Sequence, residues 1–121
     1  MRRNQVEYQI QRSIVMFLRS ALPENSVVFH VPNGGSRRTA EAARFKAMGV
    51  VAGVADLIVL TNGRPIAIEV KGPKGRLSVK QKEWASQWVE AGGVHMTVTS
   101  IDDVAIKLVA AGVPLRMRLI S

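Results

Sequence analysis

The chain has 121 residues, 47% of them hydrophobic, and its 17 Lys and Arg against 9 Asp and Glu give a formal net charge of +8. This composition excludes a disordered basic tail, and the absence of cysteine excludes disulfides, thiolate zinc sites and a cysteine nucleophile. The length predicts one domain over residues 1–121, and the basic excess favours a polyanionic partner, of which nucleic acid is the commonest.

The first half of the chain predicts helix, strand, loop and helix in that order. Apolar residues at spacings of four and three predict a helix over about 5–21, closed by Pro23. Its longest apolar run is too short for a signal peptide or a membrane span, so we expect a cytoplasmic protein without a membrane partner. A β-rich run over 26–31, a glycine-containing loop over 32–38 and a helix over about 39–48 follow.

The stretch 54–72 is interpreted as a β-hairpin around an Asn-Gly dipeptide, because both central residues of a type I′ turn need a positive φ. In that register Asp56 lies directly across from Glu69, and the side chain of Lys71 points to the same face. Two like charges that face each other destabilise a sheet, and the surrounding Ile and Val predict that this sheet is largely buried. A proton, the lysine or a divalent cation would neutralise the acids, and the cation would do so best.

Beyond the hairpin the sequence again alternates helices and strands. A loop over 72–75 leads to a helix over 78–91, a strand over 94–99 and a helix over 100–111, and the tail 115–119 alternates like an edge strand. No internal repeat or linker interrupts this order. The sequence therefore predicts an α/β fold with a single mixed β-sheet flanked by helices.

Asp56 at the head of one strand and Glu69-Val70-Lys71 on the next form the pattern D-(x)n-E-x-K of metal-dependent nucleases. Mg²⁺ prefers oxygen ligands, usually one or two carboxylates completed by water and substrate phosphate. The cation lowers the pKa of a bound water, and a lysine beside that water can orient it. The carbonyl of Val70 is a candidate further ligand. The alternative is a buried ion pair between Lys71 and one acid.

Two further residues have two interpretations each. Glu7 in the first helix is a candidate third carboxylate for the metal, but Asn4 and Glu7 also have the spacing of a capping box. Gln81 follows Ser78 at the same spacing, so it either caps its helix or contacts water or phosphate. The sequence does not decide between the two interpretations for either residue.

The histidines and tryptophans are assigned to structure rather than to chemistry. His30 and His95 lie on separate predicted strands without ligand spacing, and Trp84 and Trp88 lie one helical turn apart, as core residues do. The serines have no histidine near them in sequence, so nothing supports a Ser-His-Asp site.

With these residues the chain resembles the VRR-NUC family of the PD-(D/E)XK nuclease superfamily. The resemblance rests on Glu7, "VPNGG" at 31–35, "GVVAGVADLIVL" at 49–60 and "IEVKGPKGRLSVKQKEW" at 68–84. It implies a restriction-endonuclease-like fold with an αβββαβ core. Ala55 stands where the family usually has proline before the aspartate, and this departure concerns only backbone shape.

The resemblance also implies hydrolysis of DNA phosphodiester bonds, with Mg²⁺ or Mn²⁺ as the cofactor. The catalytic residues would be Asp56, Glu69, Lys71 and Gln81, and the metal ligands Glu7, Asp56, Glu69 and the Val70 carbonyl. Stand-alone members resemble resolvases of four-way DNA junctions, so we expect branched DNA as the partner and a homodimer that makes two symmetric cuts. The alternatives are a nuclease for flaps or single strands, an inactive basic DNA-binding module, or an enzyme that acts on RNA or nucleotides.

Residues on both sides of the E-x-K strand are expected to contact DNA. Asn33, Arg37 and Arg38 lie in the loop before the second helix, and Lys74 and Lys80 follow the strand. Lys and Arg contacts to phosphate supply most of the sequence-independent affinity for DNA. The alternative for the two arginines is that they only make a glycine-containing loop soluble.

Overall fold

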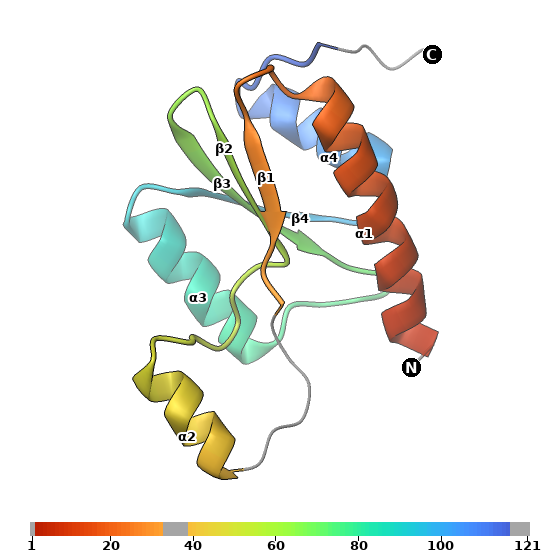
Figure 1. Cartoon of the computed structure of the whole chain (residues 1–121). Coiled ribbons are helices and arrows are strands. Elements are labelled where there is room, and N and C mark those ends of the chain that lie inside the picture. Colours follow the sequence, from red (N-terminus) through yellow and green to blue (C-terminus); the bar gives the residue numbers. More distant parts are fainter. Residues whose placement is uncertain (1, 33–38, 117–121) are drawn as a thin grey trace.

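The structure is a computed structural model that describes residues 2–32 and 39–116, without the side chains of residues 2–4. Its elements are α1 (Arg2–Ala21), β1 (Val27–His30), α2 (Thr39–Ala47), β2 (Leu57–Thr61), β3 (Arg64–Val70), α3 (Val79–Glu90), β4 (Val94–Val98) and α4 (Ile101–Ala110). The strands form a mixed sheet in the order β1-β2-β3-β4, in which β4 is parallel to β3 and the other pairs are antiparallel. The predicted α/β fold class and order of elements are confirmed (Figure 1).

The hairpin of β2 and β3 has the predicted register. Asn62 and Gly63 adopt φ values of 50° and 76°, which is the left-handed backbone that a type I′ turn requires. Thr61 pairs with Arg64 on either side of this turn. The register decides which side chains of β3 share a face, so it also decides where the carboxylate and lysine of the E-x-K motif point.

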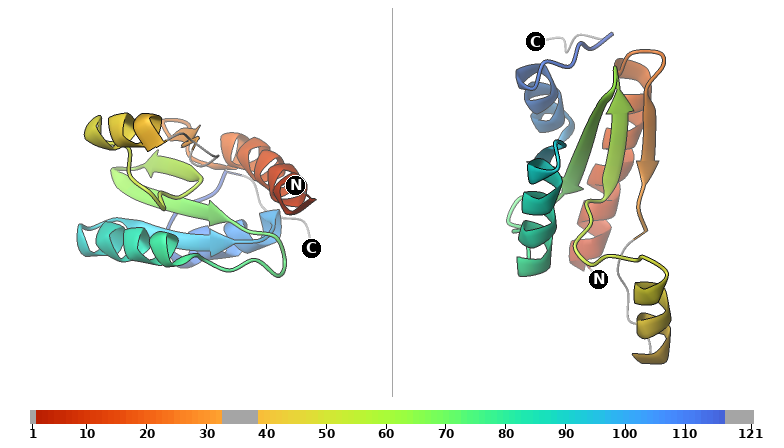
Figure 2. Two further views of the ribbon diagram at one scale, coloured as in Figure 1. Left: turned by 90° about the horizontal axis from the view of Figure 1, so that it is seen from below. Right: turned by 90° about the vertical axis from the view of Figure 1, so that its left-hand side faces the viewer.

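Different helices cover the two faces of the sheet (Figures 1 and 2). α1 and α4 pack on one face and form the main core with β2, β3 and β4. α3 lies on the other face, where Trp88 Nε1 donates a hydrogen bond to Val94 O at 2.9 Å and Trp84 packs edge-on against His95. The two tryptophans stack with ring centroids 4.9 Å apart and stay partly exposed, so they form a separate small cluster. α2 buries none of its residues and stands apart from the sheet.

α1 begins three residues before the predicted start and is buried mainly in its second half. Ile14, Leu18 and Ala21 are completely buried, whereas Val6 is 46% exposed. The first turns of α1 lie beside the loop after β3 rather than over the core, since Val6 lines a cavity with that loop. Of the helices in the described ranges, none is long and apolar enough to span a membrane.

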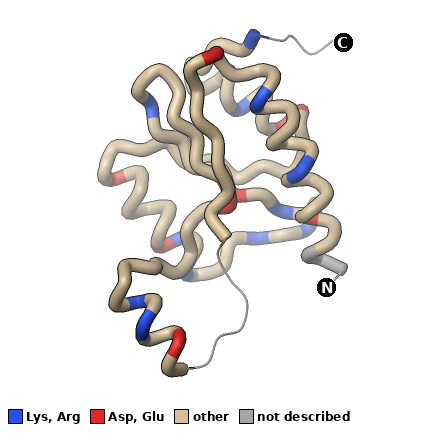
Figure 3. Tube along the Cα trace, in the orientation of Figure 1, with Lys and Arg blue, Asp and Glu red and all other residues tan. Residues whose placement is uncertain are grey.

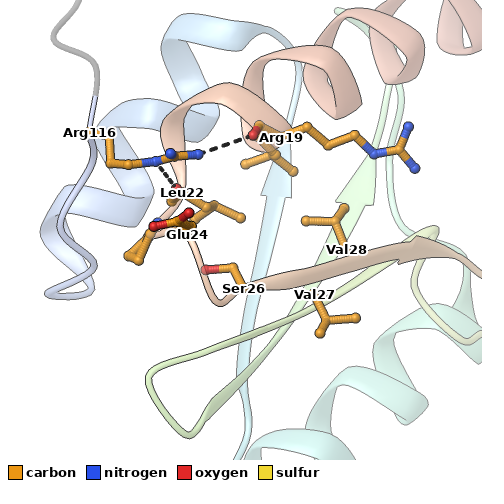
Figure 4. A pocket seen from close by; sticks show the side chains of 9 residues that line it. Arg19, Leu22, Glu24, Ser26, Val27, Val28 and Arg116 are labelled. Atoms are coloured by element: carbon orange, nitrogen blue, oxygen red, sulfur yellow. Dashed lines mark hydrogen bonds between the residues drawn. The ribbon is translucent and has the colours of Figure 1, made fainter.

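The C-terminal segment binds the end of α1. The main-chain N–H of Arg116 donates to the carbonyl of Ala21 at 2.6 Å. Its side chain donates from Nε to Leu22 O at 2.6 Å and from a terminal nitrogen to Arg19 O at 3.3 Å (Figure 4). The last carbonyls of a helix lack partners within the helix, so a cation there satisfies them and suits the helix dipole. The described part of the predicted edge strand 115–119 therefore forms no strand, and the rest lies outside the described residues.

Candidate metal centre

Asp56 and Glu69 meet at the end of the hairpin, but not as the directly opposed pair that the sequence predicts. The ladder begins at Leu57, so Asp56 lies just outside it. Instead, Asp56 Oδ2 accepts a hydrogen bond from the N–H of Val70 at 2.8 Å. The Asp56 side chain thus takes the place of the main-chain hydrogen bond that would continue the ladder. This contact holds the Asp56 carboxylate beside Glu69.

The two carboxylate oxygens of Glu69 have different surroundings, although the residue is only 3% exposed. Oε2 accepts a hydrogen bond from Gln81 Nε2 at 2.8 Å and lies 3.7 Å from Lys71 Nζ. Oε1 is also buried, but no donor group of the described residues reaches it. A buried carboxylate oxygen without a donor is unfavourable unless a proton or a cation occupies it.

The surroundings raise the pKa of Glu69 from its ordinary value of 4.5 to about 8. Burial is the largest cause because it disfavours the charged form, and the negative charge of Asp56 is the second. The charge of Glu7 raises the pKa further, as does the hydrogen bond that a protonated Glu69 can donate to Asp56, whereas Lys71 lowers it. Burial and Asp56 thus favour the protonated form of Glu69 in the metal-free protein, and a divalent cation can replace that proton.

The loop after β3 buries Lys71 to 2% exposure. The loop closes with a hydrogen bond from Gly75 N–H to Gly72 O at 2.9 Å, which folds Gly75 back onto the lysine stem. A Cβ on Gly75 would lie 3.1 Å from Lys71 Cβ and 3.2 Å from Cδ, so a glycine allows this close contact. Gly75 is only four positions from Lys71, but the sequence analysis missed this packing role.

Gln81 caps its helix, as one of the two interpretations predicts, and it also contacts Glu69. Its N–H donates to Ser78 Oγ at 3.1 Å and its Oε1 accepts from Ser78 N–H at 2.8 Å, which completes a capping box at the start of α3. With Oε1 fixed by the cap, the Nε2 of the same amide faces Glu69 and donates to it. The capping box thus orients the amide that holds Oε2 of Glu69.

Gly53 packs directly on this first turn of α3. It has a φ of 84°, and a Cβ at this position would lie 2.2 Å from the carbonyl oxygen of Lys80 and 2.9 Å from the nitrogen of Gln81. No side chain fits in that space. The segment that leads to Asp56 is therefore in contact with the turn that carries Gln81.

Glu7 reaches the edge of the site from α1. The helix begins before Asn4, so the capping-box interpretation of Asn4 and Glu7 is wrong. Glu7 Oε2 accepts a hydrogen bond from Gly72 N–H at 3.4 Å, in the loop that covers Lys71. Across the described ranges, no three His, Cys, Asp or Glu side chains lie close enough together to form a complete ligand set. The centre is thus a pair of carboxylates, with Glu7 beside it.

The oxygen donors of the pair suit a hard divalent cation. The N–H of Val70 points to Asp56, and the N–H and C=O of one strand residue point to the same side, so the Val70 carbonyl also faces this side of β3. Two carboxylates and a carbonyl are the ligands that Mg²⁺ and Mn²⁺ prefer. Since no described residue gives Oε1 of Glu69 a donor, the residues present fit such a cation.

A histidine that the sequence analysis assigned to structure also reaches this site. His30 Nδ1 lies 2.8 Å from the main-chain oxygen of Asp56 and 3.0 Å from Gln11 Nε2. Spacing could not reveal this contact, because the two residues are 26 positions apart in sequence. The available signal is the position of His30 next to the "VPNGG" stretch.

The expected DNA contacts are only partly within the described structure. Asn33, Arg37 and Arg38 lie outside it. Lys74 and Lys80 are exposed, and Lys80 Nζ lies 3.7 Å from Glu83 Oε1. Lys74 belongs to the loop that lines a cavity of about 420 Å³ beside Glu7 and Val6. Basic positions occur on α2 and around the loop between β3 and α3, whereas β1 and β2 carry none (Figure 3).

Comparisons with known proteins agree with this fold. A family model described as the VRR-NUC domain matches residues 6–100. A solved structure described as a VRR_NUC domain protein has a TM-score of 0.66 and 24% identity, over 86% of this chain and 84% of that chain. A second, described as a VRR_NUC domain, has a TM-score of 0.52 and 16% identity, over 89% of this chain and 94% of that chain. No curated protein matches the chain.

Proposed function

This chain belongs to the VRR-NUC domain family, whose domains are of the nuclease type, and we propose that it is an endonuclease that hydrolyses DNA phosphodiester bonds with Mg²⁺ or Mn²⁺. One observation carries the proposal: Glu69 has one oxygen held by Gln81 and Lys71 and one buried oxygen that no donor within residues 2–32 and 39–116 reaches. A purely structural ion pair would leave that oxygen unsatisfied, whereas a metal ligand needs it available.

The ligands in this proposal are the carboxylates of Asp56 and Glu69 and the carbonyl of Val70, with Glu7 at the edge. When bound, the cation supplies positive charge to the phosphate and lowers the pKa of a ligated water. The chain's own residues hold this arrangement in place. Val70 N–H orients the Asp56 carboxylate, and Gln81 orients the Glu69 carboxylate.

Lys71 is the residue assigned to the negative charge that develops on the reacting phosphate. Its ammonium is fixed beside Glu69 and is buried, so its charge is screened less by solvent than that of a surface lysine. A preorganised cation of this kind stabilises developing charge without reorganising during the reaction. The same ammonium can orient the attacking water, which is the second role consistent with its place.

The proposed substrate is branched DNA, with the four-way junction as its leading form and a homodimer as the active assembly. The formal charge of +8 supports a polyanion, and the exposed Lys74 and Lys80 lie on the loop and helix that adjoin the carboxylates. Asn33, Arg37 and Arg38, which lie outside the described residues, are further proposed DNA contacts. A four-way junction needs two symmetric cuts, and a two-fold dimer supplies two active sites.

The test is incubation with labelled single-stranded, duplex, flap and four-way-junction DNA in Mg²⁺, Mn²⁺ or EDTA. We expect cleavage with either metal, none in EDTA, and the highest rate on the junction. Light scattering should give about twice the chain mass of 13.2 kDa. A monomer that cuts flaps or single strands would overturn the proposed specificity for four-way junctions. Binding without cleavage in every metal would favour an inactive DNA-binding module.

A further inference from the structure

The main chain of Asp56 is held from β1, on the side away from Glu69. Its carbonyl accepts a hydrogen bond from Val31 N–H at 2.9 Å, which extends the pairing of β1 and β2 by one residue. The same oxygen lies 2.8 Å from His30 Nδ1. On the β3 side, Asp56 is outside the ladder, and its carboxylate accepts a hydrogen bond from Val70 N–H. The position of the Asp56 carboxylate therefore depends on how firmly β1 holds its backbone.

The contact with the carbonyl also decides where the imidazole hydrogen is. A main-chain oxygen only accepts, so a separation of 2.8 Å requires that Nδ1 carries the hydrogen and donates it. An Nδ1 that donates cannot also accept from the Gln11 amide 3.0 Å away. The oxygen and nitrogen of an amide have nearly the same shape, so we infer that the Gln11 amide is turned with its oxygen, in place of the nitrogen, toward the same N–H.

We propose that His30 is a positioning residue, whose Nδ1–H holds the Asp56 carbonyl and thereby keeps the Asp56 carboxylate against Val70 N–H. The metal role of Asp56 in this inference rests on the proposed function. Gln11 extends the connection to α1, where it lies one helical turn after Glu7. Gln11 and His30 therefore connect the helix that carries Glu7 to the residue that carries the Asp56 carboxylate.

The test compares three replacements of His30 in the full-length chain. In His30→Asn the amide nitrogen lies where Nδ1 was, whereas in His30→Gln it lies where Nε2 was. We expect His30→Ala and His30→Gln to lower the affinity for Mn²⁺, measured by calorimetric titration without DNA, by roughly tenfold, since one hydrogen bond is lost. His30→Asn should restore most of the affinity.

A second measurement needs no metal. In EDTA, hydrogen exchange at the Val70 amide should be roughly tenfold faster in His30→Ala than in the unchanged protein, and close to normal in His30→Asn. The Lys71 amide is the internal control, because it donates to Val98 O on the opposite side of β3, and its exchange should not change.

The two measurements separate the two ideas. If the unchanged protein fails to bind Mn²⁺, the proposed metal function is wrong, and the exchange of the Val70 amide still decides the role of His30. If Mn²⁺ binds but His30→Ala changes neither affinity nor Val70 exchange, the positioning role is overturned. Rescue by Gln and not by Asn would also overturn it, because the ring would then act through Nε2.

Discussion

The two faces of β3 are buried to the same degree but are chemically opposite. Ile66, Ile68 and Val70 point into the core under α1 and α4, whereas Ala67, Glu69 and Lys71 point toward α3, and all six residues are at most 3% exposed. The first face gains stability from apolar burial. The second keeps a carboxylate and an ammonium out of water, with Asp56 beside them, and such groups contribute little to stability or oppose it. The residues that stabilise the fold and those assigned to the proposed chemistry thus lie on opposite faces of one strand.

The largest expected effect is on the cleavage rate, and it should distinguish Glu69 from its neighbour Ile68 on the opposite face of β3. Glu69→Gln should lower the cleavage rate by roughly 10³-fold or more, because it removes a charged ligand, while DNA binding persists through Lys and Arg. Ile68→Ala should instead lower the free energy of unfolding by about 2–5 kcal/mol and leave the activity of the folded fraction intact. Urea unfolding and single-turnover cleavage measure the two effects. Full activity in Glu69→Gln would contradict the assignment of the metal centre.

A second prediction concerns the pH dependence of stability in EDTA. The pKa of Glu69 is about 8 in the folded protein and ordinarily 4.5, so the folded state binds the proton more tightly than the unfolded state. The tighter proton binding by Glu69 adds to the free energy of unfolding. This stabilisation is fully present below pH 4.5 and is lost as the pH rises through 8, a loss on the order of a few kcal/mol.

Glu69→Gln is the matched control for that measurement, because it cannot titrate. Its free energy of unfolding should fall less between pH 5 and 8 than that of the unchanged protein. Saturating Mn²⁺ should also offset the fall, since the cation replaces the proton and stabilises the folded state by mass action. Identical pH profiles for the two proteins would show that Glu69 is not the titrating group.

A third prediction concerns Gly53, which packs on the turn that carries Gln81 but is not itself a member of the carboxylate site. Gly53→Ala should slow cleavage by roughly 10–100-fold, because its Cβ would displace the turn that carries Gln81. Gly49→Ala is the control, since Gly49 also has a positive φ, 102°, but a Cβ there meets nothing within 4 Å. Both variants carry the strain of a left-handed backbone, about 1 kcal/mol, so only the difference between their rates reports on the contact. Equal rates would mean that the turn adjusts without effect.

The smallest expected effect is on the salt dependence of DNA binding, and it concerns the exposed lysines beside the carboxylates. Lys74→Ala and Lys80→Ala should each reduce the slope of log affinity against log salt by roughly 0.9, the value for one lost phosphate contact. Arg19→Ala is the control, because Arg19 lies near the far end of α1, the helix over the apolar face. Binding to labelled DNA in EDTA at several salt concentrations gives the slopes. A larger change in Arg19→Ala would place the DNA on the other side of the molecule.

Much of the candidate site follows from the sequence because it depends on local geometry. The Asn-Gly turn sets the register of the hairpin, and the register sets which side chains of β3 share a face with Asp56. The capping box of Ser78 and Gln81 is likewise encoded within four residues. The order of these motifs was sufficient to suggest the family, which the match over residues 6–100 confirms.

Only the tertiary structure decided which atoms these residues meet. The contact of His30 with Asp56 and the approach of Gly53 to Lys80 join chain segments whose meeting no turn or spacing determines. The same is true of Val6, which continues the apolar pattern of α1 but lies beyond the core, and of Arg116 at the end of that helix. The sequence thus determined the residue types of the carboxylate pair and the face that they share. The packing of α3, β1 and the loop after β3 left one oxygen of Glu69 without a donor from the part of the chain that the structure describes. A hydrogen bond depends on positions within a few tenths of an ångström, which only the assembled layers fix.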